Sequence, residues 1–320
     1  MNIKKIGLTA LAGSLVATSA FAGSLSVSGG ASFEVQHVNG GAANAGKAFS
    51  MGNSVTFSGA GELDNGLNVT VSFELDQGAA DGTDGVFDSH GLTIGNDMFG
   101  TLTFQGHGGA AAQSAVDDTA TGDIWDNGFS ATAAPVSASS NNMLAYSNSN
   151  LYDGLTVSVS YVPQATAATE YESSVDWAVA YTGIDGLTIG FAQGEDNAVK
   201  GAQADVTTYY ASYAYGPITV AYHTTEYDSE NTGTTYDQDF VAYSVAYTLS
   251  DEISVAYKVA DLSTPNATSD NDQEVSGITA SYTTGGMTIS GKMVNADNIG
   301  FSTAATADQS MWELAASFAF

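Results

Sequence analysis

The chain has 320 residues, with no cysteine and no arginine, and its 35 acidic residues against six lysines give a net charge of −29. This imbalance disfavours nucleic acids and other phosphate-rich partners, which proteins bind through basic side chains, and it favours mobile cations instead. The absence of cysteine excludes disulfides, so stability has to come from a closed hydrogen-bonded ladder or from a large core.

The first 22 residues have the features of a secretory signal. Lys4 and Lys5 precede an apolar run from Ile6 to Ala17, and Ala20-Phe21-Ala22 forms a small-x-small cleavage motif. The run is shorter than the roughly 20 residues that a membrane-spanning helix needs. We therefore expect residues 1–22 to be removed, and the mature chain, residues 23–320, to have a net charge of −31 and no transmembrane helix.

The mature chain opens with patterns typical of strands. Two strands fit over residues 25–37 and 53–63, and the stretch from Leu67 to Asp76 then alternates strictly between apolar and polar residues. Because side chains alternate across a strand, one face of this stretch is apolar and the other is polar. That division suits a membrane barrel, which turns its apolar face to lipid, as well as a soluble sandwich.

Short turn signals follow at regular intervals, at Asp64-Asn65-Gly66, Asn96-Asp97, Tyr152-Asp153-Gly154, Ile184-Asp185-Gly186, Gly216-Pro217, Ser250-Asp251 and Gly285-Gly286. Successive turns are 32 to 35 residues apart, except for one step of 55 residues. Each regular step fits two strands, one short turn and one long loop. Seven short turns and eight long connections predict sixteen strands, and the surplus between Gly106 and Asn142 predicts one oversized loop.

Two segments carry a family resemblance. FGTLTFQG, from Phe99 to Gly106, precedes the oversized loop, and NNMLAYSNSNLYDGLTVSVSY, from Asn141 to Tyr161, follows it. With the last strand, MWELAASFAF, they resemble the general diffusion porins of Gram-negative outer membranes, and most closely those of α-proteobacteria. The resemblance extends over nearly all of the mature chain.

This resemblance implies an all-β fold, a sixteen-stranded antiparallel transmembrane β-barrel whose long third loop folds into the lumen and narrows it. It also implies a homotrimer in the bacterial outer membrane, surrounded by lipid, with the terminal Phe320 recognised by the barrel assembly machinery. The chain departs from the family in one respect. Family members line the wall opposite the third loop with arginine and lysine, whereas the inward positions here include Ser54, Thr56, Ser58 and Ser72.

Carboxylates are the expected lining of the pore. If large apolar residues face lipid, the alternate positions that face the lumen are Glu34, Glu62, Glu74, Asp76, Asp176 and Glu313, with Lys258 and Lys292. The oversized loop adds Asp117, Asp118, Asp123 and Asp126, unless it stays solvated outside the lumen. Clustered carboxylates concentrate cations and repel anions over about 8 Å at physiological salt. We therefore predict a cation-preferring porin for passive diffusion of small hydrophilic solutes.

Two further sets of residues stand out. Small residues at outward positions of the first two strands, which allow another barrel to approach or let the strands curve strongly, are Gly29, Ala31, Gly59 and Gly61. Weak candidates for calcium are Asp81, Asp84 and Asp88, although they lack the spacing of a dedicated calcium loop. We expect no cofactor apart from such loosely bound calcium.

Other functional classes fit less well. The four histidines share no metal-ligand spacing and no serine lies in a nucleophile elbow, so we expect no enzyme. A secreted calcium-dependent adhesin or surface-layer β-protein would share the signal and the acidity, but it leaves the terminal phenylalanine and the oversized loop unexplained. A substrate-specific channel would need aromatic residues along the lumen.

Overall fold

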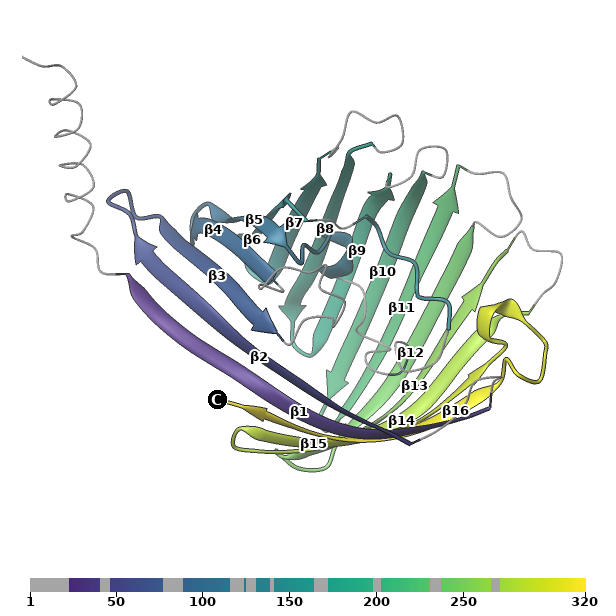
Figure 1. The fold of residues 1–320 in the computed structure, drawn as a ribbon. Helices are drawn as coiled ribbons and strands as arrows, with labels where there is room; N and C mark the ends of the chain where they lie inside the picture. The colour runs from purple at the N-terminus through teal and green to yellow at the C-terminus, as the bar shows by residue number, and fades with distance from the viewer. Residues whose placement is uncertain are drawn as a thin grey trace, which may run out of the picture.

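The computed structural model describes residues 23–40, 47–76, 89–115, 124, 131–138, 141–163, 172–197, 203–230, 237–265 and 271–320. Sixteen strands in this part form one closed antiparallel barrel, so the predicted fold class and strand number are confirmed (Figure 1). In chain order the strands are β1 Ser24–Gly40, β2 Lys47–Glu62, β3 Asn68–Asp76, β4 Ser89–Asn96, β5 Gly100–His107, β6 Met143–Tyr152, β7 Leu155–Val162, β8 Ser174–Ile184, β9 Leu187–Asp196, β10 Ala204–Tyr215, β11 Ile218–Ser229, β12 Gln238–Thr248, β13 Ile253–Ser263, β14 Gln273–Thr284, β15 Met287–Asp297 and β16 Gln309–Ala319. The described parts of the connections include the short 3-10 helices η2 Gln113–Ala115 and η4 Ile299–Phe301. Among the described residues, no helix is long and apolar enough to cross a membrane.

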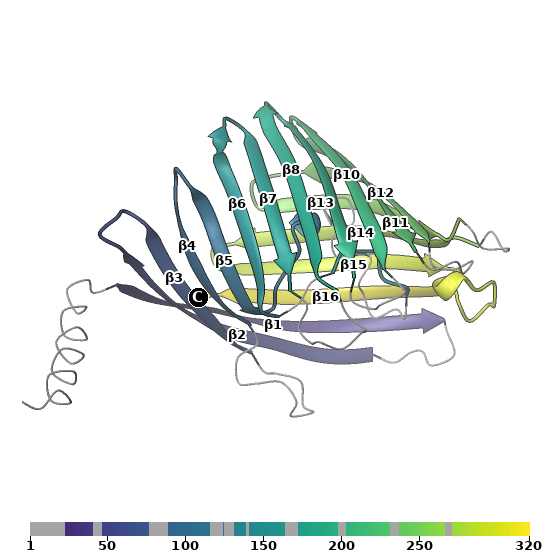
Figure 2. The same cartoon turned by 90° about the horizontal axis from the view of Figure 1, so that it is seen from above.

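The two ends of the chain close the ring. Every strand pairs with its neighbours in the sequence, and β1 pairs with β16 from Gly30 opposite Ala319 to Gly40 opposite Gln309 (Figure 2). The terminal Phe320 continues this ladder, because its backbone N–H and C=O bond to the C=O and N–H of Gly29 at 3.0 and 2.9 Å. A closed ladder has no unpaired edge, which is the condition for strands to lie in lipid.

All seven predicted short turns join consecutive strands, from the turn between β2 and β3 to the turn between β14 and β15. The first two strands are longer than their sequence patterns indicated, with 17 and 16 residues. The ladder between them extends to His37 opposite Lys47. Pairing with β1 therefore begins β2 six residues before the start that the alternation predicted, at residue 53.

Gly154, in the turn between β6 and β7, provides a test of turn geometry. Its φ is 74°, and a Cβ there would collide with the backbone nitrogen of Gly183. Gly285, in the turn between β14 and β15, has a φ of 57° but open space around a Cβ. A left-handed conformation disfavours any L-residue by roughly 1–2 kcal/mol, and the collision adds to this only at the first position. We expect Gly154→Ala to destabilise the folded barrel by about 1 kcal/mol more than Gly285→Ala, measured by urea unfolding in lipid vesicles. Equal destabilisation by the two substitutions would contradict this expectation and would show that the backbone around Gly183 moves away from the added Cβ at no cost in free energy.

Buried side chains gather inside one side of the barrel. The largest cluster contains Ile124 and residues from β12 to β16, among them Phe240, Leu262, Val275 and Val294. A second cluster joins Ala112 to Ala178, Ala192 and Tyr210 of β8 to β10. Because Ala112 and Ile124 belong to the connection between β5 and β6, the core lies between this connection and the inner wall.

Candidate pore lining

The two faces of each strand differ in what covers them. On β8, Trp177 is 39% exposed, whereas its neighbour Asp176 is 0% exposed. The same alternation separates the exposed aromatic residues of β10 and β12, such as Tyr209 and Tyr243, from the buried Thr208 and Ala242. The exposed apolar set faces outward, as a lipid-facing surface requires, and the alternate set faces the interior.

The connection between β5 and β6 bonds to inward side chains far around the ring. The Ala112 N–H donates to Ser160 Oγ of β7 at 2.7 Å, and Gln113 Nε2 donates to Thr208 Oγ1 of β10 at 2.6 Å. The Thr132 N–H donates to Gln273 Oε1 of β14 at 2.9 Å, and Gln273 Nε2 donates to the Thr132 carbonyl oxygen at 3.0 Å. The described parts of this connection therefore contact the inner wall at β7, β10 and β14.

Asp176 differs from the expectation that it lines open water. It faces inward as its position in β8 predicts, but its carboxylate accepts hydrogen bonds from Ser160 Oγ at 2.8 Å and from the Glu195 N–H at 3.1 Å. Buried carboxylates need such donors, since an unpaired buried charge is strongly unfavourable. Asp176 is therefore buried in the wall, where its carboxylate bonds to β7 and β9, and it does not form part of the channel surface.

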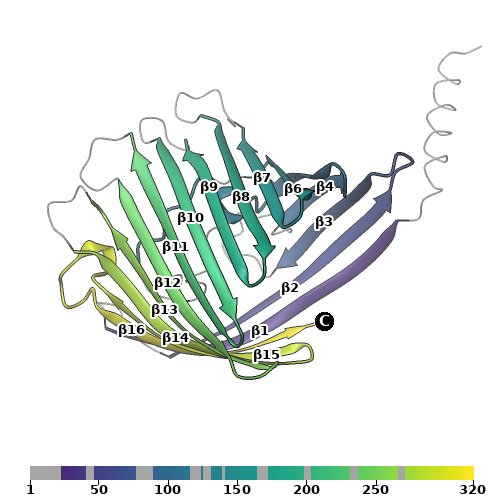
Figure 3. The same ribbon diagram turned by 180° about the vertical axis from the view of Figure 1, so that it is seen from behind.

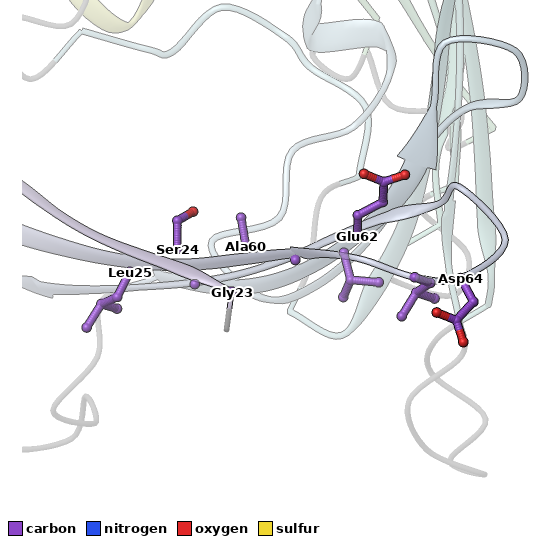
Figure 4. A pocket seen from close by; sticks show the side chains of 10 residues that line it. Gly23, Ser24, Leu25, Ala60, Glu62 and Asp64 are labelled. Carbon is purple, nitrogen blue, oxygen red and sulfur yellow. The ribbon is translucent and has the colours of Figure 1, made fainter. Parts of the chain in front are cut away.

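The inner wall of β1 to β3 carries the other predicted carboxylates, Glu34, Glu62, Glu74 and Asp76. Ser50 donates to Glu34, and Ser89 Oγ donates to Glu74 at 3.1 Å. Figure 4 shows Glu62 on the same side of the wall as Ser24 and Ala60, opposite Leu25. An open cavity of about 290 Å³ is lined by Glu74, Asp76, Ser32, Ser54 and Ser317. Glu74 and Asp76 thus border open space among neutral hydroxyl groups.

The lysines complete the charged wall. Lys292 of β15 and Glu313 of β16 lie opposite each other in the ladder and form an ion pair at 3.1 Å, with side chains 15% and 13% exposed. Lys258 occupies an inward position of β13, opposite Ser244 and Gly277. Lys292 is therefore neutralised locally by Glu313.

The small outward residues of β1 and β2 are not equivalent. A Cβ on Gly29 would lie 2.6 Å from the Ser54 carbonyl oxygen and 3.0 Å from the ring of Phe320, so Gly29 accommodates the barrel's own terminus. A Cβ on Gly59 would meet nothing within 4 Å. Gly59 and Gly61 line an outer cavity of about 580 Å³ with Leu25, Leu63 and Val69 (Figure 4). Ala31 lies one position further along the outward face of β1, opposite Asn53.

Several predicted residues lie outside the described part of the chain. These are the loop acids Asp117, Asp118, Asp123 and Asp126 and the calcium candidates Asp81, Asp84 and Asp88. Within the described ranges, no three acidic or histidine side chains are arranged to hold a metal ion.

Sequence reasoning missed the residues that fix the β5–β6 connection, Gln113, Ser160, Thr208 and Gln273. The sequence did contain a signal for a covered inner wall, because strands such as β12 are apolar on both faces. Phe240 and Ala242 alternate with Val241 and Tyr243. A strand with water on its inner face would not need apolar residues there, so this pattern indicates a covered inner wall.

Comparison with known proteins places the chain in a family. A family model described as Gram-negative porin matches residues 7–289. Among curated proteins no significant match was found. Among solved structures, the anion-selective porin from Comamonas acidovorans has 16% sequence identity and a TM-score of 0.67, covering 93% of this chain and 100% of that chain. A porin structure refined at 1.8 Å resolution has 20% identity and a TM-score of 0.68 with the same coverage. Salmonella typhi OmpF in complex with daunomycin has 14% identity and a TM-score of 0.66, covering 92% of this chain and 97% of that chain.

The structural similarities, at these identities, concern the fold, and the family match extends over most of the sequence. Porins are non-enzymatic channels, and neither the family nor the fold favours the adhesin alternative. The chain therefore belongs to the Gram-negative porin family and is a β-barrel channel protein of the bacterial outer membrane.

Proposed function

We propose that the channel is water-filled, prefers cations and passes small hydrophilic solutes by passive diffusion. The charge balance of the inner wall carries this proposal. Five carboxylates, those of Glu34, Glu62, Glu74, Asp76 and Glu313, stand against Lys258 and Lys292, and Lys292 is paired with Glu313. Carboxylates that border a pore attract cations and repel anions. The Comamonas porin is described as anion-selective; this chain has no arginine to create such a preference.

The second part of the proposal concerns the third loop, which is the connection between β5 and β6. Its described residues bond to β7, β10 and β14, and Ile124 is buried against the inner wall. These contacts support a loop that folds into the lumen and narrows it against the opposite wall of β1 to β3. Asp117, Asp118, Asp123 and Asp126 would then add negative charge across the opening.

Liposome swelling tests the channel and its preference together. Liposomes that contain the refolded protein are diluted into glucosamine, glucose or gluconate, which have similar sizes but positive, zero and negative charge. We expect uptake to decrease in that order, and liposomes with unfolded protein to show none. Equal uptake of the three solutes would contradict the cation preference, and no uptake would contradict the channel.

We also propose a homotrimer that forms through the outward face of β1 to β5. All 16 tyrosines and three tryptophans of the chain follow residue 124, so this face lacks the residues that anchor a barrel at the membrane boundary. Stacked phenylalanines occupy it instead, with ring centroids 5.8 Å apart for Phe33–Phe49 and 5.2 Å for Phe57–Phe73. β4 and β5 have eight residues each. Such strands rise about 20 Å when tilted by about 40°, less than the apolar band of about 25 Å.

Gly59→Trp tests the trimer contact. The added ring would point outward from β2 and would not clash with its own barrel. We therefore expect the monomer to fold and the trimer to be lost on native gels. Ala211→Trp is the matched control, because Ala211 occupies an outward position of β10, opposite Ile189 and Tyr222. A stable Gly59→Trp trimer would place the contact elsewhere.

Two further elements of the proposal concern biogenesis. We expect residues 1–22 to be removed, and Phe320 to be recognised by the barrel assembly machinery. The place of Phe320 in the closing ladder with Gly29 supports a role at the last step of barrel closure. Loosely bound calcium at Asp81, Asp84 and Asp88 stays a prediction.

A further inference from the structure

A pair of histidines lies on the outer face of the barrel, at the end that carries the long connections. His90 is the second residue of β4 and His107 is the last residue of β5, and the two lie opposite each other in the ladder. On the other side of β4, Phe73 of β3 lies opposite His90 (Figure 3). Phe73 stacks with Phe57 on the outward face, so His90 faces outward as well.

A β-bulge brings His107 to the same face. Gly91 pairs with Gln105. The next pair is His90 with His107, which leaves Gly106 as an extra residue on β5. Strict alternation from the inward Gln105 would turn His107 inward, but a bulge redirects the side chains beside it. The two imidazole rings consequently lie side by side, with centroids 6.2 Å apart and planes inclined by 14°.

Gly106 makes room for this arrangement. A Cβ at Gly106 would collide with Nε2 and Cδ2 of the His90 ring. The ring therefore lies over the backbone of Gly106, and its Nε2 edge faces the strand that carries His107. Gly106 is not among the glycines with a positive φ. Glycine is thus required here for the space that the His90 ring occupies and not for the backbone conformation.

Two neighbouring imidazoles are a ligand set for a transition-metal ion. Zn²⁺, Cu²⁺ and Ni²⁺ bind imidazole nitrogen, whereas Mg²⁺ and Ca²⁺ prefer oxygen. Each Zn–N bond is about 2.0–2.1 Å long, so rings that share one ion have centroids about 5 Å apart at a tetrahedral angle and at most about 6.4 Å apart. The 6.2 Å separation lies within this limit. His90 is exposed, so rotation of its side chain can bring the rings about 1 Å closer, to the tetrahedral distance.

We propose that His90 and His107 bind one divalent transition-metal ion on the outer rim of β4 and β5. One nitrogen of each ring fills a coordination position, and water fills the others. The ion ties the two strands together at the end of the hairpin opposite its turn, where the bulge interrupts the ladder. Because it binds only the folded barrel, it stabilises this hairpin. Both ligands come from one chain, so the site is independent of the proposed trimer and of the channel's selectivity.

Calorimetric titration of Zn²⁺ into the full mature protein, without an affinity tag, tests the proposal in detergent micelles. Excess Mg²⁺ is present to occupy carboxylates, because the chain has 35 acidic residues that bind divalent ions loosely. The variants His90→Gln and His107→Gln each remove one ligand. His37→Gln is the matched control. His37 lies near the same end of the barrel, opposite Lys47 and beside the ring of Trp312.

We expect one Zn²⁺ per chain in the native protein and in His37→Gln. Affinity should be at least about tenfold lower in His90→Gln and in His107→Gln, since even residues that only support metal ligands contribute about 10–100-fold. Gly106→Ala keeps both histidines but displaces the His90 ring, so it should also weaken binding. Heat-modifiable migration on gels reports whether each variant has folded.

The electron paramagnetic resonance spectrum of bound Cu²⁺ provides a second measurement, which needs only the native protein. It should show two nitrogen ligands, and one of them should be lost in His90→Gln. Equal Zn²⁺ affinity in the native protein and in both ligand variants would overturn the proposal. Loss of all Zn²⁺ binding in excess Mg²⁺, or a Cu²⁺ spectrum without two nitrogen ligands, would overturn it as well and would leave the histidines as an aromatic contact.

Discussion

Replacement of Glu74 and Asp76 by Gln and Asn is expected to lower the cation-to-anion permeability ratio about fourfold. Both carboxylates line the open cavity on the inner wall of β3. Two unit charges about 8 Å apart in water interact by about 0.5 kcal/mol, and screening over one Debye length leaves about 0.2 kcal/mol. Since the field favours the cation as much as it opposes the anion, each carboxylate changes the ratio about twofold. The reversal potential of single channels under a salt gradient measures this change.

Lys292→Gln provides the control of opposite sign. This change leaves the Glu313 carboxylate of β16 without its partner, which adds net negative charge to the inner wall. The cation-to-anion permeability ratio should therefore rise by about twofold instead of falling. The change Asp205→Asn on the outward face of β10 should have no effect, because Asp205 lies opposite Glu195 and Asp228, outside the lumen. If all three variants moved the reversal potential in the same direction, the local charge of the wall would not determine selectivity.

Loosening of the β5–β6 connection is expected to widen the channel. Ile124→Ala removes the side chain that this connection buries among Phe240, Leu262 and Val275. Truncation of a buried isoleucine typically costs 2–5 kcal/mol, roughly the energy of several hydrogen bonds, so the connection should detach from the wall more often. We expect a higher mean single-channel conductance with more frequent substates, recorded in a planar bilayer.

Val136→Ala is the matched control for this change. Val136 belongs to the same connection but is 44% exposed, so its truncation leaves the anchor intact. Gln273→Ala offers an independent route, because it removes both hydrogen bonds to the Thr132 backbone. Conductance that rises in Ile124→Ala and Gln273→Ala but not in Val136→Ala would follow from a wall-anchored loop. Conductance identical to the native value in both anchor variants would contradict it.

The barrel could be predicted from the sequence because its turns and strands are each determined by residues that are close together in the chain. Each short turn carries Gly, Asp or Asn next to alternating runs, as at Asp153-Gly154, and the interval between turns fixes the number of strands. Parity then assigns Glu74 and Asp176 to the inner face. The start of β2 was missed because pairing with β1, and not alternation, determines it.

The contacts of the β5–β6 connection could not be predicted in the same way. Gln113 bonds to Thr208, 95 residues away, and Thr132 bonds to Gln273, 141 residues away. Periodicity within a strand does not encode such pairings. For the same reason, parity identified the direction of Asp176 but not the segment that covers it. The pairing of His90 with His107 likewise depends on the ladder and its bulge, since the histidines share no metal-ligand spacing in the sequence.

The reversal potential of the native protein tests the central claim most directly. Purified, detergent-extracted protein is inserted into a planar bilayer under a potassium chloride gradient, and current is recorded from single channels. The carboxylate-rich wall predicts stepwise conductance with a reversal potential displaced toward that of potassium. Stepwise conductance that reverses at zero, or toward the chloride potential, would contradict the proposed cation preference while leaving the channel in place.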